Sequence, residues 1–194
     1  RSKSFQSRLT RRKYNRFGQG FWMADNPDEQ FDIVDEHDRV VGVARRADVH
    51  ANGWLHRAVH IMVQRPDGAV FIQKRSMEKD CHPGVWDSSA SGHLDSGEYY
   101  DTAAVRELKE ELGVSVDRIE EIGALPASEI TGQEFVRIYR IEHAGPFTLH
   151  PSEIEDGKWV EVAALDKWIE AHPEDFAPCF TKVWETVRSE FKDG

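Results

Sequence analysis

The chain has 194 residues, 35 of them acidic and 25 basic, which gives a formal net charge of -10 at pH 7. This length suits one domain with a substantial core and is short for two. Hydrophobic residues make up 39% of the chain and no apolar run approaches membrane-spanning length, so we expect a globular protein without a membrane partner. The two cysteines, Cys81 and Cys179, do not form a metal-type CxxC pair, and a reducing cytoplasm is the expected location.

The first 22 residues differ in charge from the rest of the chain. They contain seven basic residues and no acidic one, whereas the remainder holds 18 basic and 35 acidic residues. We interpret residues 1–22 as a basic N-terminal extension, favouring sequence upstream of a start at Met23 over a targeting segment or a docking tail. Residues 23–194 then form one domain with C-terminal helices. Because this acidic body would repel nucleic acid, no polynucleotide partner is expected.

Apolar periodicity predicts strands in the first half of the chain. Residues 31–46 are predicted to form two strands around a polar turn, and residues 58–75 a second hairpin that turns at the PDG of 66–68. Residues 99–112 contain no Gly or Pro, are rich in Ala, Glu, Leu and Lys, and end before Gly113. This composition predicts a helix.

The second half of the chain predicts two further strands followed by helices. Residues 118–126 and 134–143 have the apolar pattern of strands, and residues 165–172 and 176–191 that of helices. Strands of mixed order around a central helix predict an α/β fold in which helices sandwich a mixed β-sheet.

Residues 92–114, GHLDSGEYYDTAAVRELKEELGV, contain a constellation with fixed spacing. Its fixed positions are Gly92, Glu98, Arg106, Glu107, Glu110, Glu111 and Gly113. Chance would produce these coincidences less often than about once in ten million start positions. At helical spacing the three glutamates at 107, 110 and 111 share one face, while apolar residues form another.

Carboxylates held close together raise one another's pKa values unless a hard divalent cation neutralises them. A Glu-rich helix face is usually only solvated, but the arginine and the glycine-bounded loop at these offsets favour a metal site. Mg²⁺ or Mn²⁺ is the expected cofactor, because both prefer oxygen ligands.

The constellation resembles the signature of the Nudix hydrolases. The resemblance implies the Nudix fold, an α-β-α sandwich, and attack of a metal-activated water on a diphosphate. It implies Glu110 and Glu111 as the main metal ligands, and Glu107 as a further ligand or the group that orients water. By the same resemblance, Gly92 would offer its carbonyl oxygen and Glu98 would support the metal site.

The resemblance also implies that Arg106 holds the carboxylates in place by bidentate pairing. The general base in such proteins is either a helix glutamate or one from a later loop. Here the later candidates are Glu153 and Glu155, and we include Glu155 among the expected catalytic residues together with Arg106 and the three helix glutamates.

Three further segments narrow the resemblance: LHRA at 55–58, QKRS at 73–76 and HPGVW at 82–86. They resemble the branch of the superfamily that includes isopentenyl-diphosphate isomerase and its hydrolase-like relatives. The isomerase has a cysteine before its Gly-His pair, whereas this chain has Ser91, whose hydroxyl is far less acidic than a thiol. The isomerase also typically has a degenerate signature, and this one is complete. Both differences favour hydrolysis.

The same branch suggests further site residues, each with an alternative. His56, His93 and, approximately, Glu134 match metal-binding positions of the isomerase; the alternative is that both histidines are hydrogen-bonded structural side chains. His60, in the middle of a predicted strand, is expected to pack.

Three substrate-binding residues are expected. Lys74 and Arg75 would bind phosphate, or would lie at an exposed strand end. Trp86 would stack on a base, or would belong to the core.

The sequence therefore predicts a hydrolase, dependent on Mg²⁺ or Mn²⁺, that cleaves a nucleoside diphosphate linked to another moiety. An isomerase of the isopentenyl-diphosphate type is the alternative. A non-catalytic binding module is disfavoured, because the helix carboxylates are all present. The expected partner is a small-molecule diphosphate, and a homodimer is left open because dimers are common in the family.

Overall fold

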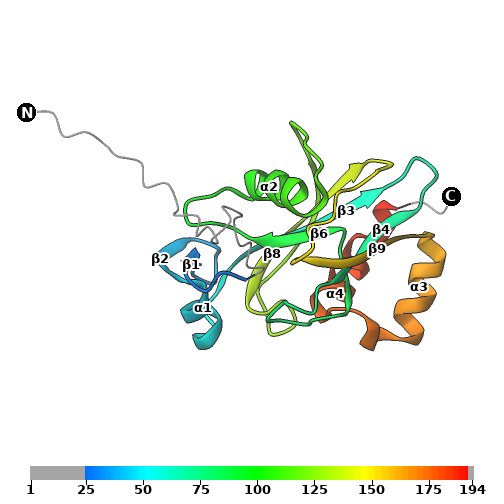
Figure 1. Cartoon of the computed structure of the whole chain (residues 1–194). Helices are drawn as coiled ribbons and strands as arrows, with labels where there is room; N and C mark the ends of the chain where they lie inside the picture. The colour runs from blue at the N-terminus through cyan, green and yellow to red at the C-terminus, as the bar shows by residue number, and fades with distance from the viewer. Residues whose placement is uncertain (1–24, 192–194) are drawn as a thin grey trace, which may run out of the picture.

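The computed structural model describes residues 25–191 (Figure 1). The interpretation of residues 1–22 as a basic extension lies outside this range. No helix within 25–191 is both long enough and apolar enough to cross a membrane.

The first half of the chain consists mainly of strands. Its elements are β1 (Gln30–Val34), β2 (Val40–Arg45), α1 (Arg46–Asn52), β3 (His56–Gln64), β4 (Val70–Arg75), β5 (Trp86–Asp87) and β6 (Ala90–His93). The second half contains α2 (Tyr100–Leu112), β7 (Glu120–Leu125), β8 (Glu134–Glu142), β9 (Ile154–Val160), α3 (Val162–Ala171) and α4 (Pro178–Val187). Single 3₁₀ turns at Pro173–Asp175 and Arg188–Glu190 flank α4.

The main sheet is mixed. Seven strands form it in the order β5-β4-β3-β8-β7, with β6 paired to β3 and β9 paired to β4, while β1 and β2 form a separate ribbon. Strands β3 and β8 are parallel, and the other pairs are antiparallel. The predicted α/β class with a mixed sheet between helices is confirmed.

Side chains of β3 alternate between two hydrophobic cores, as expected for a strand that is covered on both faces. Ala58 and Met62 belong to the core beneath α3 and α4, whereas Val59, Ile61 and Val63 belong to the core beneath α2. Figure 1 shows α2 on one side of the sheet and α4 on the other. Each polar side chain on β3 therefore points either to the core beneath α2 or to the core beneath α3 and α4.

The helix predicted at 99–112 is confirmed as α2, which ends at Gly113 in the left-handed conformation with φ of 72°. The strands predicted at 118–126 and 134–143 are confirmed as β7 and β8, and the two late helices as α3 and α4 with shifted bounds.

The hairpin predicted at 58–75 is confirmed only near its turn. Strands β3 and β4 pair at Val63 and Gln64, because β6 pairs with β3 over residues 58–61 instead. Helix α1 and strand β9 were not predicted. The segment RADVHAN of α1 is too short to show an apolar periodicity.

Gly157 on β9 provides a test of the packing over β4. A Cβ at this position would overlap the ring of Phe71, which is already in edge contact with Phe147 and Trp159 at centroid distances of 4.6 and 5.3 Å. We expect Gly157→Ala to lower the free energy of unfolding by about 1–3 kcal/mol. Gly42→Ala is the matched strand control, because its Cβ would meet only Ile33 at 3.8 Å. Equal urea midpoints for the two variants would contradict this packing.

Candidate active site

Helix α2 holds its glutamates at different depths. Glu107 and Glu111 are buried, while the side chain of Glu110 is 56% exposed. Strand β6 approaches the helix closely at Gly92, where a Cβ would overlap the Glu107 carboxyl group. Glycine at position 92 is therefore a requirement of this packing, and it allows the β6 backbone to lie close to the Glu107 carboxyl group.

Arg106 connects the acidic residues to one another. Its Nε and Nη2 atoms donate to Glu98 at 3.0 and 2.8 Å, and its Nη1 donates to Glu107 at 2.6 Å and Glu110 at 3.3 Å. Nη2 also donates to the His93 carbonyl at 2.9 Å, which attaches the helix to β6. The planar guanidinium supplies several donors in a fixed geometry, so one side chain fixes three carboxylates.

Glu111 has uncharged hydrogen-bond donors. Its Oε2 accepts from Gln73 Nε2 at 3.0 Å and from the Ser91 amide at 3.1 Å. Burial raises the pKa of Glu107 to about 8, and burial followed by the charges of Glu107 and Glu153 raises the pKa of Glu111 well above its usual range. This all-oxygen set of carboxylates needs compensating positive charge, and a hard divalent cation such as Mg²⁺ or Mn²⁺ fits it.

Glu153 is the later glutamate that lies near the helix carboxylates. Its charge contributes to the raised pKa values of both Glu107 and Glu111. Lys79 donates to Glu153 at 2.7 Å and to Asp25 at 2.8 Å, and the Lys79 side chain is only 13% exposed. The lysine therefore keeps Glu153 in place.

Glu155, the later glutamate chosen from the sequence, lies elsewhere. It begins the exposed part of β9 rather than standing in a loop, and its carboxylate is 3.6 Å from Lys74 Nζ. The pairing of β9 with β4 shifts register between Ile154 and Asp156, so Glu155 is an extra residue of the strand without a partner on β4. The role of Glu155 as a catalytic residue therefore stays a prediction, and Glu153 is the later glutamate whose charge acts on Glu107 and Glu111.

Of the expected substrate-binding residues, Arg75 lies near enough to the helix carboxylates for the charge of Glu111, after that of Asp87, to raise its pKa. Arg75 donates to Asp87 at 3.0 Å and to two carbonyls of the following loop. The ring of Trp86 packs edge to face on Trp168 at 5.6 Å. The side chain of Lys74 is 33% exposed and that of Arg75 is 15% exposed. Trp86 therefore takes part in the packing of α3, and Arg75 already has a carboxylate partner.

A cavity of about 150 Å³ lies on the other face of β6 from the helix carboxylates. Its lining includes His50, His60, Arg75, His93, Glu134 and Cys179. His50 and Cys179 were not singled out from the sequence. His50 belongs to the unpredicted helix α1, and Cys179 has no nearby motif partner, so no local signal marked either one.

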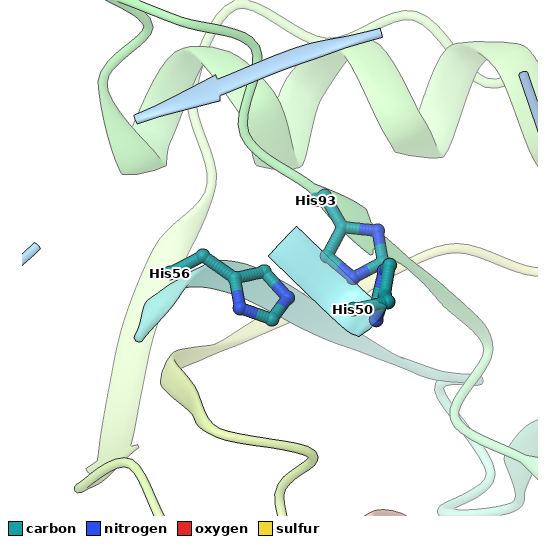
Figure 2. A group of neighbouring side chains, drawn as sticks. All are labelled: His50, His56 and His93. Carbon is teal, nitrogen blue, oxygen red and sulfur yellow. The ribbon is translucent and has the colours of Figure 1, made fainter. Parts of the chain in front are cut away.

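Three imidazoles converge beside this cavity. Figure 2 shows His50, His56 and His93 facing one another, and their ring centroids are 5.1 Å apart in each pair. Glu134 lies beside them, with its Oε1 2.9 Å from His93 Nε2 and 3.6 Å from His56 Nε2. The structure therefore brings together the residues that match the isomerase metal positions and adds His50 to them.

Two of the three imidazoles have a ring nitrogen without a hydrogen-bond partner in the described part of the chain, whereas His93 Nδ1 lies 3.1 Å from Arg46 Nη1 and His93 Nε2 lies 2.9 Å from Glu134. His56 Nδ1 donates to the Trp54 carbonyl at 2.9 Å, which leaves the Nε2 lone pair free of a proton. Within residues 25–191 neither His56 Nε2 nor His50 Nε2 has a hydrogen-bond partner. Burial lowers the pKa of His93 to about 4 and also lowers that of His50, so both are neutral near pH 7.

A mixed sheet between helices, with a Gly-Glu-Arg-Glu constellation that runs from β6 through the following loop into α2, is the architecture of a Nudix protein. Residues 54–180 match the NUDIX domain, and the chain belongs to this family.

Relatives of two kinds are similar to this chain. An uncharacterized Nudix hydrolase of Streptomyces coelicolor is 46% identical over 93 residues, covering 48% of this chain and 51% of that protein, so the match spans about half of the relative's length. An isopentenyl-diphosphate Delta-isomerase 2 of Photorhabdus laumondii is 33% identical over 162 residues, covering 80% of this chain and 90% of that protein. A crystal structure of a Deinococcus radiodurans protein aligns with a TM-score of 0.67 at 29% identity, covering 74% of this chain and 90% of that one.

Removal of the Arg106 side chain tests how far the acidic residues depend on it. Arg106→Ala would leave Glu98 and Glu107 without their cation in a largely buried site, so we expect the free energy of unfolding to fall by about 3 kcal/mol. Arg45→Ala is the control, because its pair with Asp48 is exposed and is expected to contribute little. Urea denaturation measures both variants, and an Arg106→Ala midpoint equal to that of Arg45→Ala would contradict the assignment.

Proposed function

We propose that this protein is a hydrolase, dependent on Mg²⁺ or Mn²⁺, that cleaves the diphosphate linkage of a nucleoside diphosphate joined to another moiety. The observation that carries the proposal is the buried pair Glu107 and Glu111 beneath Gly92. Burial opposes the ionisation of both carboxyl groups. Arg106 pairs with Glu107, whereas the hydrogen-bond donors to Glu111 found within residues 25–191 are the uncharged Gln73 side chain and Ser91 amide. A site of this kind gains stability when a divalent ion enters it.

Each residue of the site has a separate task in this reaction. Glu107 and Glu111 would hold the ion, which when bound lowers the pKa of water and neutralises charge on the phosphates. Arg106 fixes Glu107 and Glu98 by charge-assisted hydrogen bonds. Glu153, held by Lys79, would accept the proton of the attacking water. Glu110, which is exposed, would be a further ligand of an ion shared with the substrate.

Variants of Glu153 and Glu155 test which of the two is the general base. We expect Glu153→Gln to lower kcat for diphosphate hydrolysis by about 10² to 10⁴, because the amide cannot accept the proton of water. Glu155→Gln is the matched control two residues away and is expected to keep near wild-type activity. Phosphate or monophosphate release from a panel of nucleoside diphosphate derivatives measures both. The proposal fails if folded, metal-bound protein cleaves nothing in the panel with either ion.

Metal binding at the helix carboxylates can be measured without substrate. Saturating Mn²⁺ at about a hundred times its Kd should raise the free energy of unfolding of the wild type by about 2.7 kcal/mol. Glu111→Gln should lose most of this gain, because the amide brings no negative charge to the ion. Thermal unfolding with and without Mn²⁺ gives the comparison. An undiminished shift in the variant would show that the ion binds elsewhere.

Isomerisation of an isopentenyl-type diphosphate is the second candidate function. The cavity with three imidazoles and Glu134 supports it, as does the similarity to isopentenyl-diphosphate isomerases. Ser91 lacks a thiol, although Cys179 brings one to the same cavity from α4. Incubation with isopentenyl diphosphate and either metal separates the candidates: a dimethylallyl product supports isomerisation, and phosphate release without that product supports hydrolysis.

A further inference from the structure

A second group of potential ligands faces the same cavity and is distinct from the three imidazoles. It consists of His60 on β3, Glu134 at the start of β8 and Cys179 in the first turn of α4. One ligand atom of each, an imidazole nitrogen, a carboxylate oxygen and the thiol sulfur, lies within 4.8 Å of the other two. The three residues are far apart in the sequence, so only the packing of α4 against the sheet brings them together.

The start of α4 is anchored, which fixes the position of Cys179. The Ala177 amide donates to the Trp86 carbonyl at 2.9 Å, and Phe176 forms a parallel bridge with Trp86. Phe180 is fully buried in the core beneath the helix. A thiol held in this way keeps its direction toward β3 without help from a ligand.

His60 presents an unprotonated nitrogen to Cys179. Its Nδ1 is 2.7 Å from Ser88 Oγ and 3.7 Å from the Asp87 carboxylate, and this acidic neighbour favours a proton on Nδ1. Its Nε2 is 3.5 Å from Cys179 Sγ. Burial lowers the pKa of His60, so the ring is neutral and Nε2 carries a lone pair. A neutral imidazole with a hydroxyl and a carboxylate behind it is the usual state of a histidine metal ligand.

We propose that His60, Glu134 and Cys179 bind a transition-metal ion of the zinc class in this cavity. Nitrogen, sulfur and oxygen donors together select borderline-soft ions such as Zn²⁺ and Co²⁺ over Mg²⁺. On binding, the thiol proton passes to solvent, the sulfur forms a bond to the metal, and the ion's charge of two is balanced by the thiolate and the carboxylate. Three protein ligands leave a fourth position directed to the cavity.

The thiol gains most from such an ion. Burial, and then the negative charges of Glu134 and Asp87, raise the pKa of Cys179 well above its usual range. Without a cation the thiol therefore stays protonated against His60 Nε2, and it is a poor nucleophile. A bound metal ion would reverse this preference, because it replaces the proton with a larger positive charge.

This site differs from the helix carboxylates in position and in donor chemistry. His60 follows the even-numbered residues of β3 toward α4, whereas Glu107 and Glu111 belong to α2 on the other side of the sheet. Glu134 also contacts His93, so an ion at this site would share that carboxylate with the imidazole cluster. The experiment must therefore separate the thiol site from the three imidazoles.

Titration of the full chain with Co²⁺ tests the proposal directly. A thiolate bound to Co²⁺ gives a charge-transfer band in the near ultraviolet, and tetrahedral coordination gives strong visible bands. We expect both in the wild type, with complete displacement by one equivalent of Zn²⁺. Cys179→Ser should lose the charge-transfer band. His60→Gln should shift the visible bands. Ser88→Ala should bind Co²⁺ about ten to a hundred times more weakly, because His60 loses its hydrogen-bond partner.

Matched variants control for the other thiol and the other histidines. Cys81→Ser should keep the band, although Cys81 lines the same cavity. His50→Gln should keep it as well, because His50 belongs only to the imidazole cluster. If Cys179→Ser does not fold, alkylation of the wild type replaces it: Zn²⁺ should slow modification of Cys179 more than that of Cys81, as mass spectrometry of the peptides would show.

Three results would overturn the proposal. The first is Co²⁺ binding to the wild type without a thiolate band. The second is a band that persists in folded Cys179→Ser, or that disappears in Cys81→Ser. The third is equal alkylation rates of Cys179 with and without Zn²⁺.

Discussion

Burial of strand β3 on both faces is the constraint on which the rest of the structure depends. A central strand in this position is expected to be almost wholly apolar, yet β3 contains His56 and His60, which are 1% and 5% exposed. Buried polar groups need partners. Both histidines point to the face covered by α4, because side chains alternate along a strand, and there they meet Glu134, Ser88 and Cys179.

Strand β6 connects the buried strand β3 to the helix carboxylates. It pairs with β3, and it shares the same alternation: Gly92 faces α2, while His93 faces the imidazole cluster. Arg106 then ties α2 to the His93 carbonyl. The oxygen-ligand site and the nitrogen-rich cavity are thus separated by the thickness of one strand. A shift of β6 would disturb Glu107 on one side and His93 on the other.

The sequence could predict the helix carboxylates because their spacing is local. Positions 107, 110 and 111 share a helix face whatever surrounds the helix. Contacts between residues far apart in the sequence could not be predicted. His60 and Cys179 are separated by 119 positions, and no local pattern relates them. The positions of Glu153 and Glu155 depend on where β9 begins and on its register shift against β4, and the sequence showed no pattern for this strand. His50 was missed with its short helix.

Donor chemistry would allow the two proposed cation sites to coexist so close together. Mg²⁺ gives up its water reluctantly and favours carboxylates and phosphates, so it has little tendency to enter a cavity lined by imidazoles and a thiol. Zn²⁺ binds most donors more tightly, and selectivity against it at the carboxylates must come from geometry and supply. A buried thiol beside neutral imidazole offers Zn²⁺ a better set of ligands on the far side of β6. Binding of Zn²⁺ in the cavity would keep Zn²⁺ from occupying the helix carboxylates in place of Mg²⁺.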